Sequence, residues 1–113
     1  MVISFIKSKR IFKKVFEDGN FIKGKNISIK YIRGDTRKVE LGMVVSKKNI
    51  PLAVNRNLIR RRIKFLINQN SFIDIKKIPL GCYLVIYSAR SVLPYKKIKD
   101  SVLSIFSMVS RDT

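Results

Sequence analysis

The feature that most constrains the fold is the uninterrupted apolar run of residues 82–87, Cys-Tyr-Leu-Val-Ile-Tyr. The run has the length of an ordinary strand and falls far short of the ~20 residues that a membrane-spanning helix needs. Because odd and even positions are both apolar, the run predicts a strand at the centre of a sheet. The rest of the chain must then supply the neighbouring strands and the helices that pack against the sheet.

Helical and alternating patterns predict the elements that precede this strand. Ser8 is a good N-cap, and the apolar stripe after it predicts a helix over residues 8–18, with Gly19 just beyond its end. Gly34 and Asp35 form a turn signal between two stretches of alternating or Val-rich sequence. The predicted strands are residues 20–23, 26–33 and 38–46.

Two prolines mark the helices of the second half. Pro51 suits the first turn of a helix that is predicted to run to about Asn70, and a loop is predicted over residues 71–80. Pro94 opens the last predicted helix. Its apolar stripe consists of Ile98, Val102, Leu103, Ile105, Phe106 and Val109. The order helix, strands, helix, strand, helix predicts a single α+β domain over residues 1–113, in which one mixed sheet packs against helices.

The charge of the chain restricts its partners and its chemistry. It has 25 Lys and Arg against 7 Asp and Glu, a formal net charge of +18, and no His. Such an excess is tolerated chiefly where a polyanion neutralises it. Without His, the chain supplies neither a His-based catalytic triad nor a His-containing zinc site. The lone Cys82 excludes an internal disulfide and suits a reducing compartment, so we expect a cytoplasmic protein. We also expect neither membrane association nor a small-molecule substrate.

The positive charge is concentrated in one acid-free segment, residues 41–73. Its basic residues are Lys47, Lys48, Arg56, Arg60, Arg61, Arg62 and Lys64. Arg predominates here although Lys predominates elsewhere, and the planar guanidinium group binds phosphates and stacks on bases as Lys cannot. A general compositional excess of Lys would scatter the charge instead. The segment therefore predicts nucleic acid as the partner, ahead of an anionic membrane surface.

On a helical wheel, the predicted helix after Pro51 divides into an apolar edge and a basic arc. The apolar edge consists of Ile59, Ile63, Leu66 and Ile67. The basic arc consists of Arg56, Asn57, Arg60, Arg61 and Lys64. Cations on successive turns repel one another when no acid pairs with them. The arc is either a solvated helix face or a phosphate-binding face, and its acid-free context favours the second.

Two motifs in the acid-free segment resemble the protein component of bacterial ribonuclease P. One is the strand end Gly-Met-Val-Val-Ser-Lys-Lys at residues 42–48, and the other is the box Ala-Val-Asn-Arg-Asn-Leu-Ile-Arg-Arg-Arg-Ile-Lys at residues 53–64. Residues 12–19 resemble the Phe-x-x-Val-Phe-x-x-Gly helix end of that family, and residues 81–90 resemble its fourth strand, which ends in Ala-Arg. The resemblance spans nearly the whole chain in the right order.

Several positions depart from the family pattern. Leu58 stands where the box has a second Arg, which removes a donor from the far side of the helix. Pro51 and Leu52 stand in place of a common Gly-Asn lead-in. Lys30 aligns with a position that is often aromatic, and Tyr31 is its neighbour. These departures bear on single contacts and leave the family pattern recognisable.

The resemblance implies a fold and a division of labour. The expected fold is ribonuclease P protein-like and similar to ribosomal-protein domains. In that family a large RNA subunit holds the catalytic Mg²⁺ ions and cleaves precursor tRNA endonucleolytically, releasing its 5′ leader. The protein binds the RNA subunit and the single-stranded leader. The resemblance thus implies a ribonucleoprotein subunit with no catalytic residue and no tightly bound Mg²⁺ of its own.

The resemblance and the residue patterns together nominate the contacts. The expected RNA-binding residues are Arg56, Asn57, Arg60, Arg61, Lys64, Lys47 and Lys48. The alternative for Lys47 and Lys48 is a solvent-exposed turn without RNA contact. Phe12 and Phe16 are expected to line the leader cleft, or else to cover the sheet as core residues. Ser28 and Lys30 lie on the polar side of an alternating strand, where they either floor the cleft or form an exposed polar face.

Two other classes of protein fit the same charge and fold class. One is a ribosomal or general RNA-binding protein with no role in processing. The other is a DNA-binding domain that places the helix of residues 52–70 in a major groove. The leader cleft distinguishes the ribonuclease P hypothesis, because neither alternative needs a site for a single-stranded 5′ extension.

Overall fold

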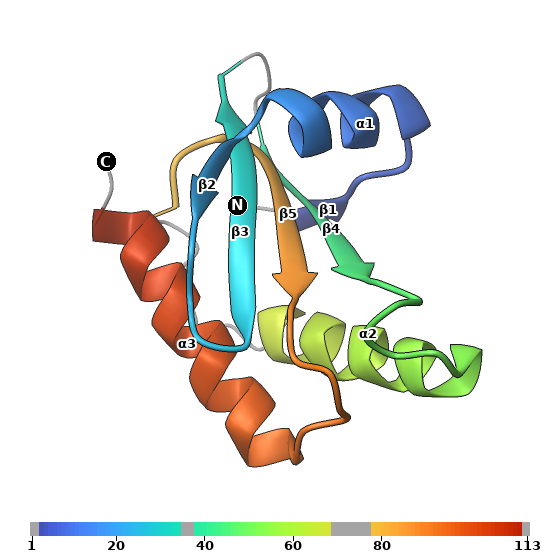
Figure 1. Ribbon diagram of the computed structural model, residues 1–113. Helices are drawn as coiled ribbons and strands as arrows, with labels where there is room; N and C mark the ends of the chain where they lie inside the picture. Colours follow the sequence, from blue (N-terminus) through green and yellow to red (C-terminus); the bar gives the residue numbers. More distant parts are fainter. Residues whose placement is uncertain (1–2, 35–37, 69–77, 112–113) are drawn as a thin grey trace.

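The computed structural model describes residues 3–34, 38–68 and 78–111. Its elements are β1 (Ile3–Phe5), α1 (Lys9–Asp18), β2 (Asn20–Ile22), β3 (Ile27–Arg33), β4 (Val39–Val45), α2 (Ala53–Asn68), β5 (Gly81–Tyr87) and α3 (Tyr95–Arg111). The strands form one sheet in the order β1-β4-β5-β3-β2. The strand β5 is central, parallel to β4 and antiparallel to β3, so the predicted mixed sheet and its central strand are confirmed (Figure 1).

The structure differs from the sequence expectation at two places. The strand β1 was not predicted, because three residues are too few to show a period; it pairs in parallel with β4. The helix α2 begins at Ala53, after Pro51, and the Leu52 carbonyl accepts bonds from the Asn55 and Arg56 amides at 3.1 Å. The predicted helix end at Asn70 and most of the predicted loop 71–80 lie outside the described residues.

The two faces of the sheet are covered by different helices. Alternate residues of β5, namely Tyr83, Val85 and Tyr87, belong to the main core with α2 and α3. Their neighbours Cys82, Leu84 and Ile86 point to the opposite face, which α1 covers in part. The central strand is therefore apolar on both sides because it has helices on both sides.

The main core accounts for the apolar stripes of α2 and α3. It contains Ile59, Ile63, Leu66 and Ile67 of α2, and Ile98, Val102, Ile105, Phe106 and Val109 of α3, with Leu103 packed against it. The stripes predicted for both helices are thus confirmed. Burial of each large aliphatic side chain contributes roughly 1.5–3 kcal/mol, so the stripe of α2 is sufficient to fix which face the helix turns outward.

The helix α1 is bounded by the residues that the sequence nominates. The Ser8 hydroxyl accepts a bond from the Ile11 amide at 3.4 Å, which caps the start of the helix. Gly19 follows the end, but its φ of −71° is extended and not left-handed. Glycine is needed there for space, because a Cβ atom would collide with the Val15 carbonyl oxygen. The end of α1 thereby lies close to β3.

Candidate nucleic-acid interface

The connection from β4 to α2 is a tight turn that presents two lysines. The Ser46 hydroxyl accepts a bond from the Asn49 amide at 3.1 Å, and the Ser46 carbonyl accepts one from the Ile50 amide at 2.9 Å. Lys47 and Lys48 lie inside this turn and both are exposed. The motif Ser-Lys-Lys therefore combines a turn-forming hydroxyl with two outward cations at the entrance to α2.

The predicted basic arc lies on the outer side of α2. The apolar edge of α2 is buried against the sheet and α3. The residues of the arc are therefore exposed or half-buried: Arg56, Asn57, Arg60, Arg61 and Lys64. The first turn of α2 contains no acid. The ion pairs seen among the described residues, Lys13–Glu17 and Lys38–Glu40, include no residue of α2. The arc is therefore a row of donors without carboxylate partners within the described part of the chain.

The members of the arc differ in how firmly they are held. The Arg56 guanidinium donates to the carbonyl oxygens of Ile50 at 3.0 Å and Pro51 at 2.7 Å, which ties the β4–α2 turn to the helix. Arg60 donates to the Asn57 side-chain oxygen at 3.0 Å. Arg61 is exposed and makes no hydrogen bond or ion pair with any described residue. Arg56 thus also has a structural role, whereas Arg61 is available to a ligand.

The other side of α2 belongs to the packing between helices. Leu58 is half-buried, and Arg62 donates to the Leu93 carbonyl at 3.4 Å, which links α2 to the loop before α3. Phe65 is 53% exposed on the same helix. With Leu58 in the place of the usual Arg, the donors of α2 are concentrated on the arc and do not encircle the helix.

A second candidate surface lies where α1 crosses the sheet. Phe12 is half-buried over Gly42 of β4, where a Cβ atom would lie 3.5 Å from the Phe12 ring and 2.8 Å from the Leu84 side chain. The glycine of the Gly-x-x-Val-Ser-Lys-Lys motif therefore makes room for the Leu84 side chain, and the aromatic of α1 lies within contact distance above it. Phe12 takes part in covering the sheet, which is one of the two roles expected for it.

Phe16 and Lys30 come together at the end of α1. The Lys30 ammonium donates to the Phe16 carbonyl at 2.8 Å and lies 4.5 Å from the centre of the Phe16 ring. The ring itself is 43% exposed. Phe21 of β2, opposite Lys30 in the strand register, is 54% exposed. Phe21 was not among the site residues predicted from the sequence. It could have been found as an aromatic residue in the short predicted strand next to the strand of Ser28 and Lys30.

Two neighbours of Lys30 are not exposed to a ligand. Ser28 lies on the expected face of β3, but it is only 4% exposed and its hydroxyl accepts a bond from the Gly24 amide at 3.3 Å. The expectation that its hydroxyl floors a cleft is thus corrected, because the β2–β3 connection covers and uses it. Tyr31 points into the main core and stacks on Tyr83 with 5.6 Å between ring centres. Lys30, and not Tyr31, occupies the α1 face.

The chemistry of the described residues is limited. They contain no group of three or more potential metal ligands, and none of their helices combines the length and apolarity of a membrane span. Cys82 is half-buried, and its thiol donates to Glu40 Oε2 at 3.2 Å. Burial, followed by the bond to Glu40, raises the pKa of the Cys82 thiol to about 11, so the nucleophilic thiolate is disfavoured.

Comparisons with known proteins agree with this geometry. A family model described as Ribonuclease P matches residues 4–109. The fold is similar to the RNase P protein of Staphylococcus aureus, with a TM-score of 0.77 and 21% identity over 92% of this chain and 93% of that one. It is also similar to the RNase P protein of Thermotoga maritima, with a TM-score of 0.74 and 18% identity over 93% and 96% of the two chains. A search of curated proteins found no match.

Proposed function

The chain belongs to the ribonuclease P family, and from that premise we propose that it is the protein subunit of a bacterial ribonuclease P. In this proposal it binds the catalytic RNA subunit and the single-stranded 5′ leader of precursor tRNA. It thereby promotes endonucleolytic maturation of the tRNA 5′ end in the cytoplasm. The chain assists a reaction that RNA performs.

The observation that carries the proposal is the basic arc of α2. Phosphate contacts dominate the affinity of proteins for RNA, and each requires a cation that no protein carboxylate already neutralises. Arg61 and Lys64 are exposed, and the turn before the helix adds Lys47 and Lys48. We assign this surface to the RNA subunit, because a continuous row of donors on a rigid helix suits the backbone of a structured RNA.

The exposed aromatics near the end of α1 support the leader-binding part of the proposal. Phe16 and Phe21 offer ring surface to bases, and Lys30 places a cation beside Phe16. Stacking on an aromatic ring contributes about 1–3 kcal/mol per base and tolerates any base, which suits a leader of variable sequence. We name Phe16, Phe21 and Lys30 together the leader surface.

The proposal assigns the Mg²⁺ ions of the reaction to the RNA subunit. When bound by the RNA subunit, Mg²⁺ would supply activation of the attacking water and stabilisation of the leaving oxygen. A site for these ions needs clustered carboxylates when a protein builds it, and the described residues offer no cluster of ligands. The residues of this chain would instead hold the RNA subunit and the leader in place, through α2 and the leader surface respectively.

Binding of precursor and mature tRNA tests the leader-binding role. The holoenzyme is assembled from this protein and a bacterial ribonuclease P RNA, and dissociation constants are measured for both tRNAs. Phe16→Ala should weaken binding of the precursor by roughly 5- to 100-fold, the equivalent of one lost stacking contact, and leave mature tRNA unaffected.

The matched control is Tyr95→Ala, which removes another partly exposed aromatic, at the start of α3. It should change neither dissociation constant. An equal loss for precursor and mature tRNA in Phe16→Ala, or no loss for either, would contradict leader binding. A general RNA-binding protein would give one of those two results.

A further inference from the structure

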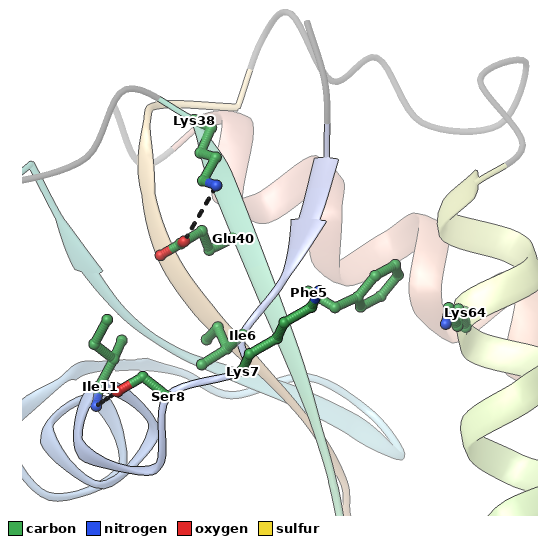
Figure 2. A pocket seen from close by; sticks show the side chains of 8 residues that line it. All are labelled: Phe5, Ile6, Lys7, Ser8, Ile11, Lys38, Glu40 and Lys64. Atoms are coloured by element: carbon green, nitrogen blue, oxygen red, sulfur yellow. Dashed lines mark hydrogen bonds and ion pairs between the residues drawn. The ribbon is translucent and has the colours of Figure 1, made fainter.

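A pocket lies at the β1 edge of the sheet. It shares Lys64 with the basic arc of α2 and otherwise lies outside both the arc and the leader surface. It has a volume of about 530 Å³. Its lining residues are Phe5, Ile6, Lys7, Ser8, Ile11, Lys38, Glu40 and Lys64. They come from β1 and the connection to α1, from α1 itself, from β4 and the residue before it, and from α2, so three layers of the fold meet here (Figure 2).

The lining combines an apolar wall with two cations that have no carboxylate partner among the described residues. Phe5, Ile6 and Ile11 supply the wall, and the ring of Phe5 points toward Lys64, whose ammonium lies 4.7 Å from the ring centre. Lys7 and Lys64 are both exposed, and neither forms an ion pair with a described residue.

The acid in the pocket is already neutralised. The Glu40 carboxylate lies 3.8 Å from the Lys38 ammonium. Its other oxygen accepts the bond from the Cys82 thiol. With this carboxylate paired, the pocket presents apolar surface together with positive charge, and that is the complement of a nucleotide: a planar base joined to an anionic phosphate.

We propose that this pocket binds one unstacked nucleotide of the ribonuclease P RNA subunit, with its phosphate at Lys7 and Lys64 and its base against Phe5, Ile6 and Ile11. The inference rests on the proposed function and extends the RNA contact from α2 to the opposite helix layer. Lys64 belongs both to the basic arc and to this pocket. An RNA strand bound along the arc can therefore continue into the pocket over positively charged surface.

The position of the pocket selects the RNA subunit over the leader. In the sheet order β1-β4-β5-β3-β2, the pocket lies at β1, whereas Lys30 and Phe21 of the leader surface lie on β3 and β2 at the other side. A strand held at the leader surface would have to cross the whole sheet to reach Lys7. The RNA bound along α2 has only to continue past Lys64.

Salt-dependent binding of the RNA subunit tests the assignment. A transcript of a bacterial ribonuclease P RNA is titrated with the wild-type protein, with Lys7→Gln, and with Lys96→Gln as an exposed control at the start of α3. Loss of one phosphate contact should weaken binding about fourfold at 0.15 M salt and reduce the slope of log K against log salt by about 0.7. Lys96→Gln should match the wild type.

Lysine acetylation identifies the RNA that occupies the pocket. In the absence of precursor tRNA, the RNA subunit should protect Lys7 and Lys64 from the acetylating reagent. Lys96 should remain reactive. Protection of Lys7 by precursor tRNA alone, or equal effects of Lys7→Gln and Lys96→Gln, would overturn the proposal. In both of these outcomes the wild-type protein still binds the RNA subunit, so only the pocket proposal fails. If the wild-type protein does not bind the RNA subunit at all, the proposed function fails.

Discussion

Individual cations of the basic arc are held by the rest of the protein to different degrees. The Arg56 guanidinium donates hydrogen bonds to the carbonyl oxygens of Ile50 and Pro51, whereas Arg61 has no partner among the described residues. A helical wheel places both in one arc and cannot separate them, because it contains no information about the turn that precedes the helix.

Substitution of the two arginines should separate stability from RNA affinity. Arg56→Ala should lower the free energy of unfolding by about 1–3 kcal/mol, because two carbonyl oxygens lose a charged donor. Arg61→Ala should change stability by less than about 0.5 kcal/mol, as expected of an exposed side chain without partners. Urea denaturation measures both. Equal stability of the two variants would contradict the anchoring role of Arg56.

Arg61→Ala also tests the arc as an RNA contact. Arg61→Ala should reduce the slope of log K against log salt for the RNA subunit by about 0.7, because one phosphate contact is lost. Filter binding at several salt concentrations measures the slope. An unchanged slope would remove Arg61 from the interface even if the protein still binds RNA.

Cys82 should be a slow nucleophile in the folded protein. Burial and the bond to Glu40 raise its pKa from an ordinary value of 9.0 to about 11. At pH 8 the thiolate fraction is then roughly a hundredfold lower than in the unfolded chain, and the greater nucleophilicity of a more basic thiolate offsets part of this, so alkylation by iodoacetamide should slow by roughly ten- to a hundredfold. The control is the same reaction in guanidinium chloride. Equal rates in the two conditions would show that the thiol is exposed and unpaired.

The pKa of Cys82 also sets a direction for stability against pH. Because the thiol is more strongly protonated in the folded state, its stabilising contribution is complete below about pH 9. The contribution declines as the pH rises toward about 11, where the folded thiol also loses its proton. The measurement is the difference in stability between the wild type and Cys82→Ala, and a difference that increased in favour of the wild type between these pH values would contradict the assignment.

At the scale of elements, the connection from β5 to α3 depends on one tyrosine. The Tyr87 hydroxyl donates to the Ser91 carbonyl at 2.6 Å and accepts from the Leu93 amide at 3.0 Å. Arg62 of α2 donates to the carbonyl of the same Leu93. The loop before α3 is therefore attached both to the central strand and to α2.

Removal of this hydroxyl should loosen the loop. Tyr87→Phe should lower the free energy of unfolding by about 1–3 kcal/mol, because the Leu93 amide and the Ser91 carbonyl lose a partner inside the protein. Tyr95→Phe, on a more exposed tyrosine, should be neutral. Chemical denaturation distinguishes them, and identical midpoints for both variants would contradict the role of Tyr87.

Elements with a clear period were predictable from sequence, and those set by contacts across the chain were not. The stripes of α2 and α3 and the double-sided β5 follow from local hydrophobic pattern alone. The strand β1 was missed because its pairing with β4 is a long-range contact of a very short segment. Ser28 was placed on the correct face, but its burial depends on the β2–β3 connection, which alternation does not reveal.

At the scale of the molecule, the fold distributes a net charge of +18 over distinct surfaces. The sheet separates α1 with the leader surface from α2 with the basic arc, and the pocket at the β1 edge borders both helices. Self-repulsion of this charge is relieved when a polyanion binds. The proposed function, in which one protein holds two RNA segments at once, requires such separated surfaces.

Reconstitution of cleavage tests the central claim most directly. The protein is added to a bacterial ribonuclease P RNA at a Mg²⁺ concentration too low for the RNA to act alone, and release of the 5′ leader from precursor tRNA is measured. The account predicts that the wild-type protein restores cleavage at the mature 5′ end. A folded protein that leaves the rate at that of the RNA alone would contradict its assignment as a ribonuclease P subunit.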